Sequence, residues 1–281
     1  MITKRKLYYL LSPSLRFALR RLYFAPIDTW DFLTGKKDHM MPPKGLIFTG
    51  SGDFKKTGEH YVDVLKELCG LMPDHRVLDI GCGIGRIAIP LTKYLSAEGS
   101  YEGFDIVKKG IGWCKKNITA SFPNFRFLHF DLRNDLYNKK TERPPKEFVF
   151  PFEDNSFDQV VLISVFTHMM PDDAEHYLKE IRRVLKPKGK CLVTNFILNP
   201  ESRVYMKTNP GFRFDHNFGN YSLMDKNVKE ANIAFEEEFM ISLINGSSLI
   251  VENTLYGYWS GRQRIDSFDF QDIMILSKKK I

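Results

Sequence analysis

Short apolar runs alternate along the chain with segments in which apolar residues recur every three or four positions. A continuous apolar run is typical of a buried parallel strand, and the wider spacing is typical of a helix with one buried face. The alternation therefore predicts an α/β fold built on a doubly wound sheet. Strands are expected at residues 76–80, 101–106, 125–130, 156–165, 190–198, 249–253 and 272–277.

Helices are expected between these strands, at 58–70, 86–95 and 173–186 and in the segment that follows residue 106. Gly70 is well suited to end the first of them, because glycine adopts the left-handed conformation common after a helix. Pro90 falls inside the second, where it removes one backbone hydrogen bond. The pattern from 58 to 281 is thus that of a single large domain.

The first part of the chain, residues 1–57, is expected to hold a basic amphipathic helix and a lid segment. Ser12 followed by Pro13 predicts the helix start. Apolar residues recur at helical spacing, with arginines on other faces: Leu15, Ala18, Leu19, Leu22 and Tyr23, against Arg16, Arg20 and Arg21. This helix could lie on an anionic membrane surface, but we favour a lid packed on the main domain, since such stripes are usually buried. Glycines and prolines predict an ordered loop from 26 to 57.

Two segments of the main domain lack a clear period. Residues 133–153 are polar and rich in lysine, which is typical of a solvated loop. Residues 199–245 show no apolar run suited to a strand but are rich in aromatic residues and histidine, among them Tyr205, Phe212, Phe214, His216, Phe218 and Tyr221. We interpret this second segment as an insertion on the substrate side of the domain, where it could roof a pocket or simply pack.

The most informative stretch is V-L-D-I-G-C-G-I-G at residues 77–85, where an apolar strand ends in Gly81, Gly83 and Gly85. Glycine tolerates positive φ and has no Cβ, so the backbone can pass close to a ligand before a helix begins. A dinucleotide site requires G-x-G-x-x-G, whereas this turn is G-x-G-x-G and follows Asp79. A carboxylate here suits a ligand with an ammonium and a sulfonium group better than a pyrophosphate. The competing interpretation is an ordinary strand-to-helix connection.

A second carboxylate, Asp105, ends the next predicted strand. In a doubly wound sheet it would lie at the carboxyl edge beside the glycine turn, where its two oxygens could accept both hydroxyls of a ribose. We therefore predict Asp105 as the ribose ligand. An exposed loop aspartate is the alternative.

The glycine turn with Asp79, the position of Asp105, and E-I-x-R-V-L-K-P-x-G at 180–189 together resemble the class I S-adenosylmethionine-dependent methyltransferases, in particular their small-molecule branch. The match covers about residues 77–198. The resemblance implies a Rossmann-like, mostly parallel seven-stranded sheet with an antiparallel C-terminal strand, an N-terminal helical lid and an insertion after the fifth strand. It implies S-adenosylmethionine as cofactor, bound by residues Asp79, Gly81, Cys82, Gly83, Gly85, Asp105, Ile106, Asp131, Leu132 and Ser164.

Within that set, Ile106 is expected against the adenine face, and Asp131 and Leu132 are expected as further adenine contacts. A helix cap or turn residue is the alternative for Asp131. The family's use of the segment before the glycine strand also suggests Asp53, Phe54 and Tyr61 as pocket residues, although ordinary packing explains them equally well.

Methyl transfer is an in-line displacement, and a hydroxyl acceptor must first lose its proton. His168 follows the fourth predicted strand and is our candidate general base, with Asp172, Asp215 and His216 in reserve. A structural histidine is the alternative.

Three other classes of methyltransferase are disfavoured. Enzymes that methylate the amino group of a purine or cytosine carry N/D-P-P-Y/F after the fourth strand, where residues 164–167 read S-V-F-T. Enzymes that methylate a cytosine carbon need a cysteine after a proline, and metal-dependent catechol-type enzymes need clustered carboxylates, and the sequence shows neither.

We accordingly expect methylation, most simply at oxygen, of a small-molecule, sugar or lipid-linked glycan acceptor. The net charge of +7 leaves an RNA methyltransferase as a competing hypothesis, ranked lower because the basic residues look scattered and no separate RNA-binding module is evident. A protein that binds the cofactor without turnover is a third hypothesis, and a dehydrogenase is a fourth.

Four widely spaced cysteines and no apolar run of eighteen residues predict a cytoplasmic protein. Peripheral contact to the inner face of a membrane through the N-terminal helix is a further option.

Overall fold

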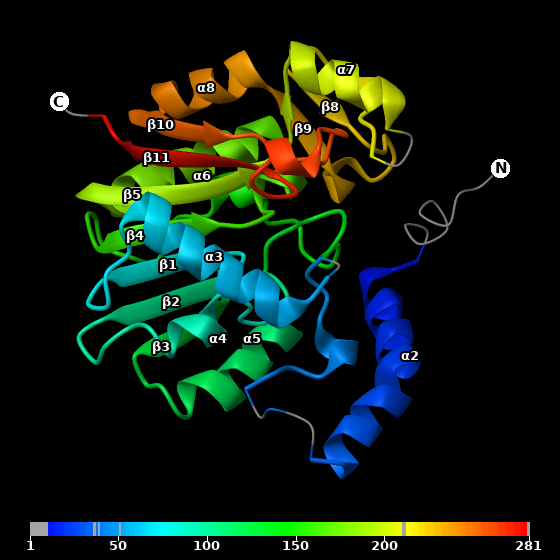
Figure 1. Cartoon of the computed structure of the whole chain (residues 1–281), viewed down its shortest axis with the longest axis vertical. Helices are drawn as coiled ribbons and strands as arrows, with labels where there is room; N and C mark the ends of the chain where they lie inside the picture. Colours follow the sequence, from blue (N-terminus) through cyan, green and yellow to red (C-terminus); the bar gives the residue numbers. More distant parts are fainter. Residues whose placement is uncertain (1–10, 36–37, 39, 51, 210–211, 280–281) are drawn as a thin grey trace.

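A seven-stranded sheet forms the centre of the protein, seen in a computed structural model that describes residues 11–35, 38, 40–50, 52–209 and 212–279 (Figure 1). Its strand order is β10-β11-β5-β4-β1-β2-β3. The strands are β1 (Arg76–Ile80), β2 (Ser100–Asp105), β3 (Phe125–His129), β4 (Phe157–Leu162), β5 (Leu185–Asn195), β10 (Leu249–Leu255) and β11 (Asp272–Lys278). β11 is antiparallel to both its neighbours, and the β1 to β5 pairs are parallel. The predicted fold class is confirmed.

Helices cover both faces of this sheet because successive strand residues point to opposite sides. Val77 packs with α3 (Phe54–Cys69), α4 (Ala88–Leu91) and α5 (Lys108–Cys114), the last continued by a π turn, η2 (Lys115–Thr119). Leu78 packs on the other face with α6 (Pro171–Val184) and α8 (Glu237–Gly246). The order of strands reverses at β1, with β2 on one side and β4 on the other, so the carboxyl edge between them is the crevice where such sheets bind ligands.

The helix after the glycine turn is shorter than expected. Its regular part is α4, four residues long, whereas the sequence pattern predicts 86–95. Pro90 has no N–H for the Arg86 carbonyl, so the ladder cannot run regularly from the turn. Gly58 of α3 packs closely on that carbonyl, since a Cβ at Gly58 would lie 2.2 Å from the Arg86 oxygen.

The N-terminal helix, α2 (Pro13–Leu33), begins as predicted, with Ser12 as N-cap. It continues through Pro26, so the loop expected from residue 26 is wrong up to residue 33. The helix docks through Asp28, whose carboxylate accepts the backbone N–H groups of Lys44 (2.7 Å) and Gly45 (3.0 Å) in η1 (Lys44–Leu46). The predicted lid packing through the apolar face is also wrong, because all five of its residues, Leu15, Ala18, Leu19, Leu22 and Tyr23, are exposed.

The segment 133–153 is only partly the solvated loop that its charges suggest. Phe148 and Phe150, beside η3 (Pro145–Glu147), are almost fully buried and contact Phe104 edge-on at 5.6 and 5.2 Å between ring centroids. Charged residues dominate the sequence here, but the aromatic ones decide where the segment folds back onto the sheet.

The insertion after the fifth strand contains strands that its sequence does not reveal. A second sheet of order β6-β9-β8-β7 is formed by β6 (Ile197–Leu198), β7 (His216–Asn217), β8 (Tyr221–Leu223) and β9 (Ile233–Glu236). Strands of two to four residues are too short to display a period, which is why the pattern does not predict them. Helix α7 (Pro200–Thr208) and the turns η4 (Phe166–His168), η5 (Lys229–Ala231) and η6 (Arg264–Asp266) complete the described elements.

None of the helices in the described part of the chain combines the length and apolar character needed to cross a bilayer.

Candidate active site

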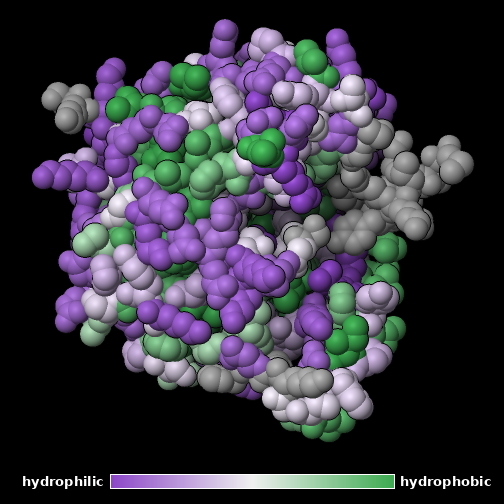
Figure 2. Space-filling model, in the orientation of Figure 1, coloured by the Kyte–Doolittle hydropathy of each residue, from purple (hydrophilic) through white to green (hydrophobic). Residues whose placement is uncertain are grey.

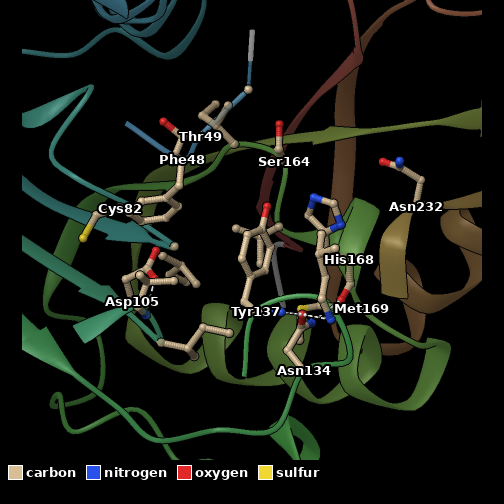
Figure 3. A pocket seen from close by; sticks show the side chains of 18 of the residues that line it. Phe48, Thr49, Cys82, Asp105, Asn134, Tyr137, Ser164, His168, Met169 and Asn232 are labelled. Carbon is tan, nitrogen blue, oxygen red and sulfur yellow. Dashed lines mark hydrogen bonds between the residues drawn. The ribbon is translucent and has the colours of Figure 1, made fainter. Parts of the chain in front are cut away.

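A cavity of about 430 Å³ opens at the carboxyl edge of the main sheet. Its walls come from the turn after β1, the end of β2, the residues directly after β4, helix α2, turn η4 and the insertion after β5, which contributes Phe212, Ala231 and Asn232. In Figure 3, Cys82 and Asp105 lie on one side, His168 and Asn232 on the other, and Phe48 and Tyr137 between them. Its volume is in the range typical of small-molecule sites.

The glycine turn forms the floor of this cavity with backbone conformations that favour glycine. Gly81, Gly83 and Gly85 have φ values of +74°, +61° and +80°. A Cβ at Gly81 would lie 2.5 Å from the Val165 side chain, and one at Gly83 would lie 2.6 Å from Thr49. The turn therefore needs glycine both for its conformation and for its close approach to neighbouring side chains.

Asp105 holds the turn in place at the tip of β2. Its carboxylate accepts the N–H of Gly83 at 2.8 Å through one oxygen and the N–H of Val107 at 2.7 Å through the other. Burial raises the pKa of Asp105, and these two backbone donors act against the rise. Each oxygen keeps a further lone pair, so the carboxylate can still accept two hydroxyl groups from a ligand.

Asp79, at the end of β1, is a buried carboxylate with a neutral partner. One of its oxygens accepts the Tyr101 hydroxyl at 2.6 Å, and the side chain lines the cavity. Burial raises the pKa of Asp79 to about 7, although the Tyr101 hydrogen bond and the Arg86 charge act in the opposite direction. A cationic ligand group beside it would stabilise the ionised carboxylate.

His168 lines the opposite wall, in turn η4 directly after β4. Its Nδ1 lies 2.9 Å from the Glu230 carbonyl oxygen. Because a carbonyl can only accept, Nδ1 carries the proton and Nε2 carries the lone pair in the neutral ring. Burial lowers the pKa of His168, so the ring is neutral at pH 7 and able to take a proton.

Ser164 and Gln271 form a polar corner between β4 and β11. The Ser164 hydroxyl donates to the Gln271 side-chain oxygen at 2.9 Å, and the Ser164 N–H donates to the Thr194 hydroxyl at 2.8 Å. Ser164 has a φ of +60°, which is uncommon for a residue with a side chain. This backbone conformation turns the chain from β4 into η4 and so sets the position of His168.

The structure gathers most of the predicted site residues around the cavity. Those that line it are Asp79, Gly81, Cys82, Asp105, Ile106, Leu132, Ser164 and His168. Gly83 and Gly85 shape the turn without lining the cavity. Asp131 does not line it either, and its carboxylate accepts the Asn138 side-chain amide at 2.7 Å.

The reserve candidates lie elsewhere. Asp172 is exposed at 77% of its side chain and pairs with Lys146, and neither Asp215 nor His216 lines the cavity. Asp53 caps α3 by accepting the N–H groups of Lys55 and Lys56.

Several residues that line the cavity are not predicted from the sequence. Phe48 and Thr49 come from the expected loop, Asn134 and Tyr137 come from the expected solvated segment, and Arg86 directly follows the last glycine. Among these, Arg86 alone stands beside a recognised motif. The ring of Tyr137 meets His168 edge-on at 5.5 Å between centroids, but no periodic neighbours in the sequence draw attention to it.

A doubly wound sheet with an alternating-glycine turn after β1 and an acid at the tip of β2 defines a nucleoside-binding α/β fold of the methyltransferase class. Residues 77–189 match the family model described as a methyltransferase domain. Residues 77–189 therefore form a methyltransferase domain with the class I fold, and the resemblance to S-adenosylmethionine-dependent methyltransferases that the sequence predicts is confirmed for this part of the chain. S-adenosylmethionine is the cofactor of this class.

Similar proteins agree with this assignment. A demethylmenaquinone methyltransferase of Staphylococcus aureus (strain MRSA252) is 34% identical over 134 residues, which are 47% of this chain and 48% of that protein. The methyltransferase GfsG of Streptomyces halstedii is 24% identical over 143 residues, or 51% of this chain and 45% of that protein. The chain thus spans about half the length of these curated relatives.

The PH0226 protein of Pyrococcus horikoshii OT3 shares the fold, with a TM-score of 0.55, 18% identity, and coverage of 83% of this chain and 95% of that one.

Proposed function

We propose that the protein transfers a methyl group from S-adenosylmethionine to a hydroxyl-bearing small-molecule, sugar or lipid-linked acceptor, with His168 as general base. The observation that carries the proposal is the layout of one cavity, which Asp79 also lines, with Asp105 on one side and the neutral His168 ring on the other (Figure 3). When bound, S-adenosylmethionine supplies a methyl group activated by the positive sulfonium.

The residues at the glycine turn suit this cofactor. Asp105 has lone pairs left for two ribose hydroxyls after accepting the N–H groups of Gly83 and Val107. Asp79 is a buried carboxylate hydrogen-bonded to the neutral Tyr101 hydroxyl, and it would accept the cofactor's ammonium group. Gly81 and Cys82 of the glycine turn line the cavity directly, so a ligand there can contact the backbone of the turn.

On the acceptor side, His168 can remove the hydroxyl proton. Its Nδ1 is held by the Glu230 carbonyl, so the proton is accepted at Nε2. The Asn134 amide donates to the His168 backbone carbonyl at 3.1 Å, which helps to fix the position of the ring. Loss of the proton leaves an acceptor oxygen, or the ring carbon conjugated with it, as the nucleophile.

The walls favour an acceptor with an apolar body. Aromatic side chains contribute much of the lining: Phe17, Phe48, Tyr137, Phe196, Phe212 and Phe270. The similarity to a demethylmenaquinone methyltransferase, at 34% identity, and to a ubiquinone/menaquinone biosynthesis C-methyltransferase, at 30% identity, supports a ring compound as acceptor and makes carbon methylation the second candidate beside oxygen methylation. The same base serves both, because each begins with removal of a hydroxyl proton.

The test uses S-adenosylmethionine with a ¹³C-labelled methyl group and a panel of hydroxylated ring compounds, sugars and short RNA. S-adenosylhomocysteine formation measures turnover, and the ¹³C shift of the product distinguishes a methyl on oxygen from one on carbon. We expect turnover with a ring acceptor. Binding of the cofactor with no turnover on any acceptor would instead favour the cofactor-binding protein without activity, and turnover on RNA alone would favour the RNA methyltransferase.

His168→Asn tests the role of the base in the same assay. We expect kcat to fall by about 10²- to 10⁴-fold, the usual contribution of a positioned general base, with cofactor affinity unchanged. The wild-type rate should rise with pH through a pKa below 6.5 and be flat at higher pH, because the base must be neutral and burial lowers its pKa. An unchanged kcat in the variant would assign His168 a structural role.

A further inference from the structure

Helix α2 carries a continuous apolar stripe that faces away from the rest of the protein. Its members are Leu15, Leu19, Leu22, Tyr23, Trp30 and Leu33, which fall within an arc of about 100° at about 100° per residue. Tyr23, Leu22 and Leu33 expose 75%, 73% and 73% of their surface. Of the fourteen exposed large hydrophobic side chains in the described chain, eight lie on this helix. The stripe is therefore a concentrated feature and not ordinary surface scatter.

The hydrogen bonds and ring contact that attach α2 to the domain come from residues outside the stripe. Attachment uses the other side of the helix, where Asp28 binds the backbone of η1 and Phe17 meets Phe48 edge-on at 5.5 Å between ring centroids. Arg16 is buried on this side and donates to the Leu136 carbonyl. Folding thus leaves the apolar stripe available to another surface.

The charge of the protein is concentrated in the same region. Residues 1–37 contain eight lysines and arginines and two aspartates, a net charge of +6 out of +7 for the whole chain. The basic residues themselves are spread along the chain, and over the rest of the chain taken together the acidic residues nearly balance them. Both aspartates are engaged on the docking side, Asp28 with the η1 backbone and Asp31 with Lys44 at 3.4 Å. The stripe is accordingly accompanied by net positive charge.

The same helix also borders the cavity. Pro13, Arg16, Phe17 and Arg20 line it, so one side of α2 faces the cavity and another bears the stripe. Figure 2 shows hydrophobic surface along the outer edge of the region that Figure 1 draws as α2, next to a hollow in the molecular surface. A surface that covered the stripe would lie beside the cavity entrance.

We propose that α2 docks the protein on an anionic lipid bilayer, with the stripe among the acyl chains and the net positive charge of residues 1–37 attracting the anionic headgroups. Leucines flanked by Trp30 and Tyr23, with basic residues and few acids, match an interfacial helix. Nucleic acid would be bound by charge and would gain nothing from exposed leucines, so lipid is the favoured partner. An acceptor with an apolar tail could then pass from the bilayer along α2 into the cavity, a route that rests on the proposed function, whereas the docking does not.

Vesicle flotation of the full chain tests the docking. The probes are vesicles of phosphatidylcholine alone and of phosphatidylcholine with about one third phosphatidylglycerol. The stripe variant is Leu19→Glu with Leu22→Glu, and the matched control is Val204→Glu with Ile265→Glu, two exposed hydrophobic residues outside α2. We expect the wild type and the control to bind anionic vesicles, with binding at least about tenfold weaker to neutral vesicles and at least about tenfold weaker for the stripe variant.

Calorimetric titration with S-adenosylmethionine checks that all variants are folded, since neither substitution pair lies in the cavity lining. The proposal is overturned if the wild type binds neither vesicle, if the stripe variant binds as well as the wild type, or if the stripe variant only abolishes a dimer in solution. Salt-sensitive binding of RNA without vesicle binding would also overturn it. Vesicle binding without any methyl transfer would contradict the proposed function and leave the docking intact.

Discussion

At the scale of single residues, the buried carboxylates of Asp79 and Asp105 are expected to bind different groups of the cofactor. Asp105 accepts two backbone N–H groups that hold the glycine turn, and Asp79 accepts one hydroxyl. Both keep oxygens available to the cavity they line. Their contributions can therefore be separated by the part of the cofactor that each would bind, hydroxyls for Asp105 and a cation for Asp79.

Asp105→Asn should weaken S-adenosylmethionine binding by about 100-fold, because the two charge-assisted hydrogen bonds it would make are worth about 1.5 to 3 kcal/mol each and one acceptor becomes a donor. Asp131→Asn is the matched control. Since Asp131 does not line the cavity, its variant should bind within about twofold of the wild type. Calorimetry gives both affinities, and equal losses in the two variants would contradict this placement of the adenosyl group.

Asp79 should make cofactor affinity depend on pH. Its pKa of about 7 in the free protein means that acid protonates it, while an ammonium ligand binds the ionised form. Affinity should thus be highest above pH 7 and should fall about tenfold per unit as pH drops below it. Asp79→Asn should bind more weakly at pH 8 and lose this dependence. If Asp79→Asn kept the full pH dependence of cofactor affinity, the titrating group would be a different one, either in the protein or the amine of the ligand.

At the scale of elements, we expect the glycine turn to tolerate substitution poorly. Gly83→Ala forces a side chain into a φ of +61° and places its Cβ 2.6 Å from Thr49, so we expect a loss of about 1 to 3 kcal/mol in the free energy of unfolding. Gly112→Ala is the control, because Gly112 lies in α5 with nothing within 4 Å of the added Cβ. That change should be neutral or stabilise by up to about 1 kcal/mol. Urea unfolding of both variants and the wild type measures the change in the free energy of unfolding. Equal values for Gly83→Ala and Gly112→Ala would contradict the strain in the turn.

The sequence could predict the sheet and the turn but not the whole cavity. Short apolar runs that stop at a glycine or an aspartate, such as 76–80, are local signals that do not depend on distant contacts. Phe48 and Tyr137 reach the cavity from segments without a period, so only the tertiary structure brings them there. The apolar face of α2 is a different case. The periodicity of the sequence predicts the apolar face correctly, but it cannot tell whether that face packs on the domain or stays exposed.

At the scale of the whole molecule, the two halves of the cavity have different origins. The main sheet supplies the turn, Asp79 and Asp105, which follow the family pattern over residues 77–189. Helix α2, the segment 133–153 and the insertion after β5 supply further walls, and α2 and the insertion lie outside that match. We therefore expect cofactor binding to depend on the part that matches the family model, and acceptor choice to depend on the walls outside it.

The central claim is that the alternating-glycine turn and Asp105 form a site for an adenosyl sulfonium and not for a dinucleotide. Calorimetric titration of the full chain with S-adenosylmethionine, S-adenosylhomocysteine and NAD tests it most directly. We predict one-to-one binding of the first two compounds and no heat with NAD. Heat with NAD alone, or no heat with either adenosyl compound, would contradict the claim.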